Sequence, residues 1–172
     1  MSGAGSAPGE ARARRAGRAL VVDGADRVLL IRGEDPADPS RGGFWFPPGG
    51  GVEADETVED ATRRELREEL GLEIGDLGPV VMERESLFRL DEVWYRQYDS
   101  IRLVEAPPGF EPPSPESTDE LELSTVTEIR WFTTAELRRL GEPVYPRRLV
   151  ALLDHLRRHG PPDPPWQEVA GS

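Results

Sequence analysis

The segment from Gly50 to Leu72 constrains this chain more than any other part of it. It reads GGVEADETVEDATRRELREELGL and carries eight acidic residues against three arginines, a local net charge of −5. Carboxylates at this density repel one another unless a cation lies among them. The segment therefore predicts a site lined by oxygen atoms that suits a hard metal ion.

The same segment has the pattern of an amphipathic helix from Thr57 to Leu70, ended by Gly71 as a C-cap. Glu65, Glu68 and Glu69 fall at positions i, i+3 and i+4 and so share one face. Like charges at that spacing destabilise an isolated helix, whereas Mg²⁺ favours carboxylate oxygens and substrate phosphates. A solvated helix rich in Glu and Arg could show the same REXXEE pattern, so the preceding glycine turn and the full spacing decide for the metal site.

Composition narrows the remaining chemistry. The 172 residues suffice for one domain with a core, and the chain has no cysteine and no lysine, since all 21 basic residues are arginine. Thiol chemistry, a Walker-type phosphate loop and a Schiff-base lysine are therefore excluded. The net charge of −12 argues against a duplex-DNA binder, and no apolar run predicts a membrane span. The charged N-terminus lacks the apolar stretch of a secretory signal, so the cytoplasm is the expected location.

Short β-rich runs and loops surround the acidic helix. Residues 1–14 are expected to be a flexible tail, 15–159 the folded domain and 160–172 a proline-rich tail that Trp166 could attach to the body. PPGGG is expected to be a turn, and residues 105–118 a proline-rich acidic loop. The remaining expected elements are strands at 18–22, 28–31, 80–89, 93–104 and 129–132, and helices at 133–140 and 147–159.

The segment from Gly50 to Leu72 resembles the Nudix box, G-x5-E-x7-R-E-U-x-E-E-x-G-U, with no fixed position missing. Trp45 and Pro48-Gly49-Gly50 just ahead of it, two strands before it and a terminal IRWF-TTAEL unit are similar to the family's surroundings. The resemblance covers roughly residues 15–159. It implies an α+β fold, an α/β/α sandwich around a mixed sheet, and hydrolysis of a nucleoside diphosphate linked to a moiety X.

The resemblance also implies roles for individual residues. Glu68 and Glu69 match the glutamates that hold divalent metal, Mg²⁺ or Mn²⁺, and Glu65 matches a metal ligand, a general base, or both. Arg64 matches the arginine that orients a box glutamate, Glu56 matches a glutamate that assists the metal cluster, and Gly49 matches a metal ligand through its carbonyl. A further glutamate beyond the box is expected, with Glu128 as the first candidate and Glu120 and Glu122 behind it.

The substrate stays open at this point. A proline typical of ADP-ribose members is missing, since Leu87 and Phe88 occupy that zone. ADP-ribose or a nucleotide sugar therefore competes with an oxidised or ordinary nucleoside triphosphate. The expected partner is a small nucleotide, with a homodimer as a further expectation. A nucleotide-sensing module with little turnover is one alternative, and the intact box glutamates argue against it. A structural or interaction protein, which would bind no metal at all, is the other.

Overall fold

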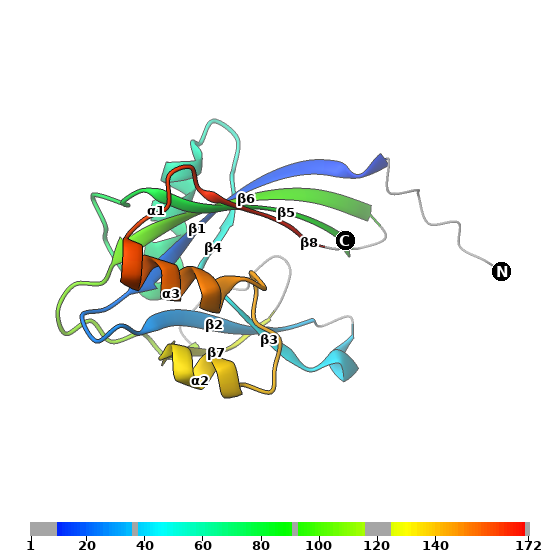
Figure 1. Ribbon diagram of the computed structural model, residues 1–172. Coiled ribbons are helices and arrows are strands. Elements are labelled where there is room, and N and C mark those ends of the chain that lie inside the picture. Colours follow the sequence, from blue (N-terminus) through cyan, green and yellow to red (C-terminus); the bar gives the residue numbers. More distant parts are fainter. Residues whose placement is uncertain (1–9, 36–37, 91–92, 116–124, 171–172) are drawn as a thin grey trace.

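The computed structural model describes residues 10–35, 38–90, 93–115 and 125–170. Within these ranges, eight strands form one mixed β-sheet with three α-helices packed around it (Figure 1). The strands are β1 (Arg12–Val22), β2 (Val28–Glu34), β3 (Gly43–Phe46), β4 (Gly49–Gly51), β5 (Val80–Leu90), β6 (Val93–Glu105), β7 (Thr125–Phe132) and β8 (Trp166–Ala170). The helices are α1 (Val58–Leu70), α2 (Thr134–Arg139) and α3 (Leu149–His159), and Pro39–Arg41 forms a short 3₁₀ turn.

The sheet is organised around β1, whose neighbours come from distant parts of the chain. Strand β6 runs parallel to it along its whole length, from the pair Arg12–Tyr95 to the pair Val22–Glu105. On the other edge β1 pairs with β4, and it meets β2 at the hairpin end through Val22 and Val28. The order β3-β2-β1-β6-β5-β8 continues outward, with β7 paired to β2. Strands β1 and β2 thus form a hairpin, but each of them has its longest partner elsewhere.

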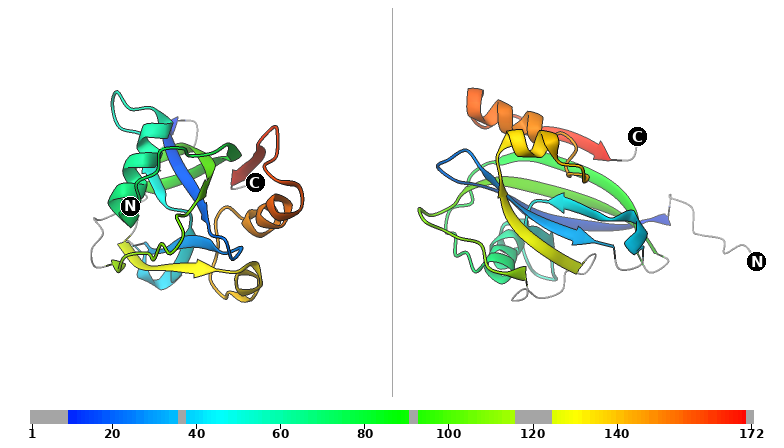
Figure 2. Two further views of the ribbon diagram at one scale, coloured as in Figure 1. Left: turned by 90° about the vertical axis from the view of Figure 1, so that its left-hand side faces the viewer. Right: turned by 90° about the horizontal axis from the view of Figure 1, so that it is seen from below.

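Two hydrophobic clusters lie on opposite faces of the sheet, because successive residues of a strand point to opposite sides. Ala19 and Val21 of β1 pack in one cluster with Leu66 and Leu70 of α1. Leu20 packs in the other, whose remaining buried members include residues of β2, β5, α2 and α3: Val28, Leu30, Met82, Leu137, Leu149, Leu152. Helices α1 and α3 accordingly cover opposite faces (Figure 2), and the expected sandwich with a single mixed sheet is confirmed.

Glycine brings α1 close to the sheet. A Cβ added at Gly17 of β1 would lie 2.2 Å from Oγ1 of Thr62 and 2.5 Å from the carbonyl oxygen of Val58. Helix α1 starts at the N-cap Thr57, which forms a capping box with Asp60, and ends at Gly71 in the left-handed region with φ of 63°. The first turn of α1 therefore sits directly on the β1 backbone, which fixes the height of its acidic face above the sheet.

Three local expectations differ from the structure. Gly49–Gly51 of the PPGGG run is not only a turn but forms strand β4, antiparallel to Ala16–Arg18. Within the stretch expected to be a C-terminal tail, Trp166–Ala170 forms β8 and pairs in parallel with Met82–Ser86. Both runs lack the alternating apolar pattern that marks a strand, since one has no side chains and the other lies on a sheet edge. Likewise β1 begins at Arg12, inside the segment expected to be flexible.

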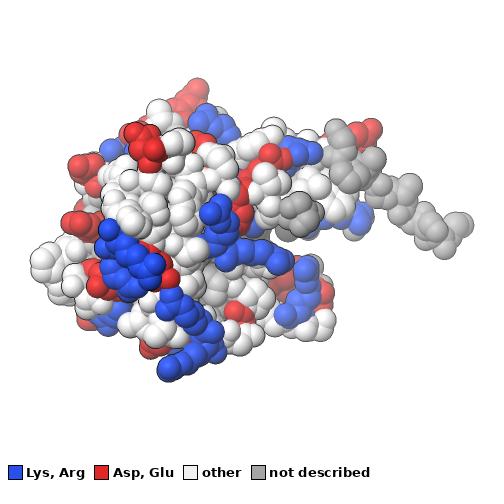
Figure 3. Space-filling view, in the orientation of Figure 1, with Lys and Arg blue, Asp and Glu red and all other residues white. Residues whose placement is uncertain are grey.

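The surface charge is unevenly placed. On the face seen in Figure 3, arginines gather over α2 and α3, where Arg138, Arg139, Arg157 and Arg158 occupy the last turns of the two helices. Cations near a helix C-terminus interact favourably with its dipole.

Within the described part of the chain, no helix is long and apolar enough to span a membrane.

Candidate active site at the acidic face of α1

Strand β4 lies across the acidic face of α1 and contacts it at each of its three glycines. The N–H of Gly49 donates to Oε2 of Glu69 at 2.9 Å, and the carbonyl of Gly51 accepts from Nη2 of Arg64 at 3.0 Å. Between them, a Cβ added to Gly50 would lie 2.3 Å from Oε1 of Glu65. Gly49 itself has φ of 143°, which side chains disfavour. Glycine is thus required here because backbone and carboxylates occupy the space that side chains would need.

Glu69 is the most unusual acid of the site. It is 4 % exposed, and its Oε1 atom is buried without a hydrogen-bond partner. Burial raises the pKa of Glu69 to about 8, and the nearby Glu65 adds to this, while the Gly49 N–H and the Arg18 charge work in the opposite direction. An unpaired buried carboxylate oxygen is costly, so this atom needs a cation or a proton.

Arg64 holds the other carboxylates together. Its Nε and Nη2 atoms donate to the two oxygens of Glu56 at 2.9 and 3.1 Å, a bidentate pair. Its Nη1 donates to Oε1 of Glu65 at 2.8 Å and to Oε2 of Glu68 at 3.3 Å. These hydrogen bonds raise the pKa of Arg64 and lower that of Glu56. One guanidinium therefore joins three glutamates to the carbonyl of Gly51.

Glu65 and Glu68 differ in their surroundings. The Glu65 side chain is 13 % exposed, and burial raises its pKa although the Arg64 hydrogen bond and charge counteract that rise. The Glu68 side chain is 46 % exposed and reaches Arg64 from one helical turn away. The acidic face therefore grades from the buried Glu69 through Glu65 to the accessible Glu68, as a site open to solvent on one side would require.

The acidic face brings together Glu56, Arg64, Glu65, Glu69 and the backbone of Gly49. Among the described residues, no three acidic, histidine or cysteine side chains already converge on one point as a preformed metal cluster. Arg64 instead lies between the carboxylates. The donor set nevertheless fits a hard cation, because it consists of carboxylate oxygens and includes the unpaired Oε1 of Glu69.

Glu128 lies apart from this group, on β7 opposite Arg32 of β2. Its neighbour Ile129 packs in the cluster that contains α1, so alternation directs Glu128 to the opposite face of the sheet. Its assignment stays a prediction, and the other two candidates, Glu120 and Glu122, lie outside the described residues.

Two residues beside the site were not singled out for it from the sequence. Asp99 of β6 is buried and accepts hydrogen bonds from Nε of Arg18 and Nε2 of Gln97, both at 2.9 Å. Arg18 of β1 also donates to the carbonyls of Pro47 and Gly49. The sequence signal available was a charged residue in each of two β-rich runs, which alone does not distinguish a buried pair from an exposed position.

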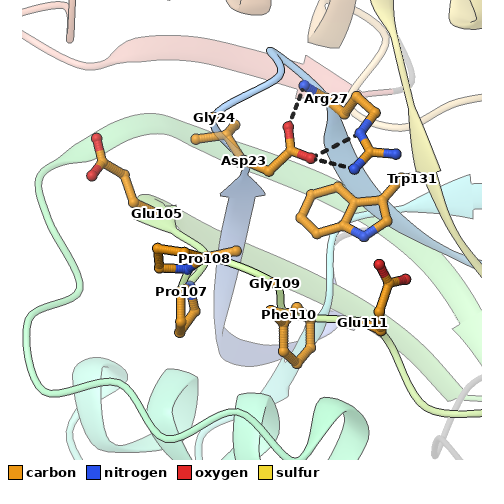
Figure 4. Close-up of a pocket in the computed structure, with 12 residues that line it drawn as sticks. Asp23, Gly24, Arg27, Glu105, Pro107, Pro108, Gly109, Phe110, Glu111 and Trp131 are labelled. Carbon is orange, nitrogen blue, oxygen red and sulfur yellow. Dashed lines mark hydrogen bonds and ion pairs between the residues drawn. The ribbon is translucent and has the colours of Figure 1, made fainter.

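A cavity of about 550 Å³ lies elsewhere, at the end of the β1–β2 hairpin (Figure 4). Its lining includes Asp23, Arg27, Pro108, Phe110 and Trp131, and none of the box glutamates. The guanidinium of Arg27 is 5.4 Å from the centre of the Trp131 ring and is also bonded to Asp23. The cavity is therefore separate from the acidic face of α1.

We compared the sequence with protein-family models and with curated proteins. The model of the NUDIX domain family matches residues 12–168. A putative nudix hydrolase 1 from Caenorhabditis elegans is 31 % identical over 153 residues, which are 84 % of this chain and 37 % of that protein. A putative 8-oxo-dGTP diphosphatase 2 from Mycobacterium tuberculosis is 56 % identical over 62 residues, which are 34 % of this chain and 43 % of that protein.

Solved structures extend the likeness to the fold. The crystal structure of a MutT NUDIX hydrolase from Burkholderia pseudomallei superposes with a TM-score of 0.59 and 25 % identity, over 82 % of this chain and 96 % of that one. The matches with this chain span less than half of the length of each of these curated relatives.

Proposed function

This chain belongs to the Nudix family, and on that premise we propose that it hydrolyses a pyrophosphate bond of a nucleotide with the help of a divalent cation. The observation that carries the proposal is the pairing of Glu69 with the β4 backbone. The carboxylate of Glu69 is nearly inaccessible to solvent. One of its oxygens accepts a hydrogen bond from the Gly49 N–H, and the other has no hydrogen-bond partner. Keeping such a group costs stability, which a bound cation would recover.

The residues that would hold the cation are Glu65, Glu68, Glu69 and the carbonyl of Gly49. Family members generally use divalent metal ions, and for this chain we propose Mg²⁺ or Mn²⁺, which favour oxygen ligands. When bound, such an ion supplies charge neutralisation for the phosphate oxygens and a lowered pKa for water.

Each side chain has a task that follows from its position. Glu65, half-way between the buried and the accessible end of the acidic face, would accept the proton of the attacking water or hold the cation. Arg64 fixes the orientation of Glu65 through Nη1 while Glu56 anchors the other side of the guanidinium. Glu68 is accessible enough to meet the substrate side of the site. The glycines of β4 keep the backbone close enough for Gly49 to contribute its carbonyl.

For the substrate we propose a nucleoside triphosphate in preference to ADP-ribose or a nucleotide sugar. Matching relatives include an 8-oxo-dGTP diphosphatase from Proteus vulgaris, a putative 8-oxo-dGTP diphosphatase 2 from Mycobacterium tuberculosis and a CTP pyrophosphohydrolase from Escherichia coli. Each of these matches covers about a third of this chain, so they favour a class of substrate and not one nucleotide. Cytoplasmic location and a homodimer stay predictions.

The test is a nucleotide panel with Mg²⁺ and with Mn²⁺, with products separated by chromatography. The panel contains 8-oxo-dGTP, the ordinary nucleoside triphosphates, ADP-ribose and a nucleotide sugar. A triphosphate substrate would release a nucleoside monophosphate and pyrophosphate, whereas ADP-ribose would release AMP and a sugar phosphate. Tight binding without turnover of any compound would contradict the proposal and support a nucleotide-sensing module.

A further inference from the structure

The side chain of Arg18 forms hydrogen bonds both with Asp99 in the sheet and with the backbone of Pro47 and Gly49. Its side chain is 15 % exposed and projects from β1, and its Nε atom donates to Oδ1 of Asp99 at 2.9 Å. Asp99 is itself inaccessible and also accepts from Gln97 at 2.9 Å and from Arg84 at 3.4 Å. A carboxylate with three donors around it is a rigid anchor, because moving any donor away would leave buried charge less well compensated.

The other end of the guanidinium reaches the backbone ahead of the box. Nη1 of Arg18 donates to the carbonyl of Pro47 at 3.2 Å and to that of Gly49 at 3.4 Å. The carbonyl between them, that of Pro48, accepts from the N–H of Ala19 at 2.9 Å. Arg18 and the residue after it thus hold three consecutive carbonyls. Proline has no N–H, so Pro47 and Pro48 have no backbone donor with which to secure this turn themselves.

The backbone of Gly49 is consequently held both at its N–H and at its carbonyl. Its N–H points to Glu69, and its carbonyl accepts the longer of the two Arg18 bonds. Space is tight as well, since a Cβ at Gly49 would lie 2.8 Å from Cγ of Arg18. The guanidinium also lies 5.4 Å from the centre of the Phe46 ring, which limits its rotation. A bond of 3.4 Å is weak, and a carbonyl oxygen has a second lone pair, so the Gly49 carbonyl can still accept a cation while its backbone stays in place.

We propose that Arg18, anchored by Asp99, is a positioning residue that holds the Pro47–Gly49 backbone so that the Gly49 carbonyl can join the divalent cation. This inference rests on the proposed function, because it assumes that the acidic face of α1 binds the cation. It assigns to β1 and β6 a part in cation binding that the box itself does not contain. Groups that orient metal ligands from outside typically change metal affinity about 10- to 100-fold when they are removed.

A competing explanation makes the opposite prediction. If Arg18 acted only through its positive charge, replacing it with a neutral residue would remove repulsion and strengthen binding of a cation. If it acts by positioning, the same replacement weakens binding despite the lost repulsion. The sign of the change in affinity therefore decides between the two explanations.

The experiment measures Mn²⁺ binding by calorimetry to metal-free protein, without nucleotide, for the wild type and four variants. Arg18→Gln is expected to bind Mn²⁺ roughly 10-fold more weakly, with Arg18→Lys between it and the wild type because one ammonium cannot bridge Asp99 and both carbonyls. Asp99→Asn is expected to weaken binding less than Arg18→Gln, since Arg18 keeps its carbonyl contacts. The matched control is Arg15→Gln, an exposed arginine three residues earlier on the same strand, which should leave binding unchanged.

A second readout is the Mn²⁺ concentration for half-maximal turnover of the best nucleotide. In Arg18→Gln it should rise in step with the dissociation constant while kcat at saturating metal changes much less. Unchanged or tighter Mn²⁺ binding in a folded Arg18→Gln protein would overturn the inference, and if that variant fails to fold, unchanged binding in Arg18→Lys would do so. Failure of the proposed function would look different, because the wild type itself would then hydrolyse no nucleotide of the panel.

Discussion

The acidic face of α1 and the cavity at the β1–β2 hairpin differ in how closely their atoms are packed. The cavity encloses about 550 Å³ between proline, phenylalanine and tryptophan side chains (Figure 4). The acidic face instead has glycine backbone pressed against glutamates, with no room for a methyl group at Gly50. Each region contains a buried polar atom without a partner, Nε1 of Trp131 in one and Oε1 of Glu69 in the other. The two atoms differ in what they imply, because an unpaired indole N–H costs far less than an unpaired buried carboxylate.

This difference teaches that the volume of a cavity is a poor guide to the site of chemistry in this molecule. A site for a small cation and a phosphate group needs closely spaced oxygen atoms, and close spacing leaves little empty volume in the metal-free state. Changes at the acidic face should therefore alter turnover, while changes at the cavity should alter stability alone.

The largest effect is expected for Glu69→Gln. Turnover should fall by roughly 10³-fold, about 4 kcal/mol of activation free energy, because the amide cannot supply a negative oxygen to the cation. The same variant should be no less stable than the wild type near pH 8, since a neutral amide still accepts from Gly49 without the cost of a buried charge. Steady-state kinetics and thermal denaturation measure both quantities, with Glu59→Gln on the exposed side of α1 as the control. Wild-type kcat in purified Glu69→Gln would remove Glu69 from the site.

Gly50→Ala should have the next largest effect. The added Cβ would lie 2.3 Å from Oε1 of Glu65, so either the carboxylate or β4 must shift. We expect kcat/KM to fall about 10- to 100-fold, since small displacements of catalytic groups are costly. In Gly75→Ala, by contrast, the new Cβ meets nothing within 4 Å, and kinetics should be unchanged. Equal kinetics in the two alanine variants would show that the tight packing of β4 on Glu65 has no functional consequence.

The stability of the metal-free protein should depend on pH through Glu69. Its pKa is raised from 4.5 to about 8 by folding, so the folded state holds a proton that the unfolded state has lost between these values. Stability contributed by this group is therefore highest below pH 4.5 and falls as the pH rises toward 8. Denaturant titrations at a series of pH values should show this decline, and Glu69→Gln should flatten it. An identical slope in the variant would mean that Glu69 is not the group responsible.

Trp131→Phe at the cavity should have the smallest effect. It removes the unpaired indole N–H and the contact with Arg27 while leaving an apolar ring. The free energy of unfolding should change by no more than about 1 kcal/mol, because the gain from removing an unpaired donor offsets lost packing. Turnover should stay within two-fold, as measured on the same substrate as the other variants. A loss of turnover comparable to that of Gly50→Ala would show that the cavity serves the reaction and would end the contrast drawn above.

The local elements of the site could be predicted from sequence because their signals are local. Thr57, Asp60 and Gly71 mark the ends of α1, and the spacing of Glu65, Glu68 and Glu69 places them on one face. The same holds for α2, which starts with a capping box of Thr133 and Glu136 in the stretch where a helix is expected. The family followed from the box, and the fold class and sheet type followed from the resemblance to that family.

The remaining features depend on pairings between distant residues, which one sequence does not display. Gly49–Gly51 becomes a strand only because β1 lies beside it, and no side-chain pattern in three glycines could have signalled this. The contact of Arg18 with Asp99 joins residues 81 positions apart. The edge strand β8 pairs with β5 across a similar distance, so its short polar sequence looked like a tail.

The parallel pairing of β1 with β6 also has a consequence for the order of folding. Arg18 is aligned with Ile101, so the first strand is completed by residues that lie some eighty positions later in the chain. Helix α1 can form early from local signals, whereas closing so long a loop is slow compared with forming local contacts. The cation site, which needs β1, β4 and α1 in register, should therefore mature late, after the C-terminal half of the chain has joined the sheet.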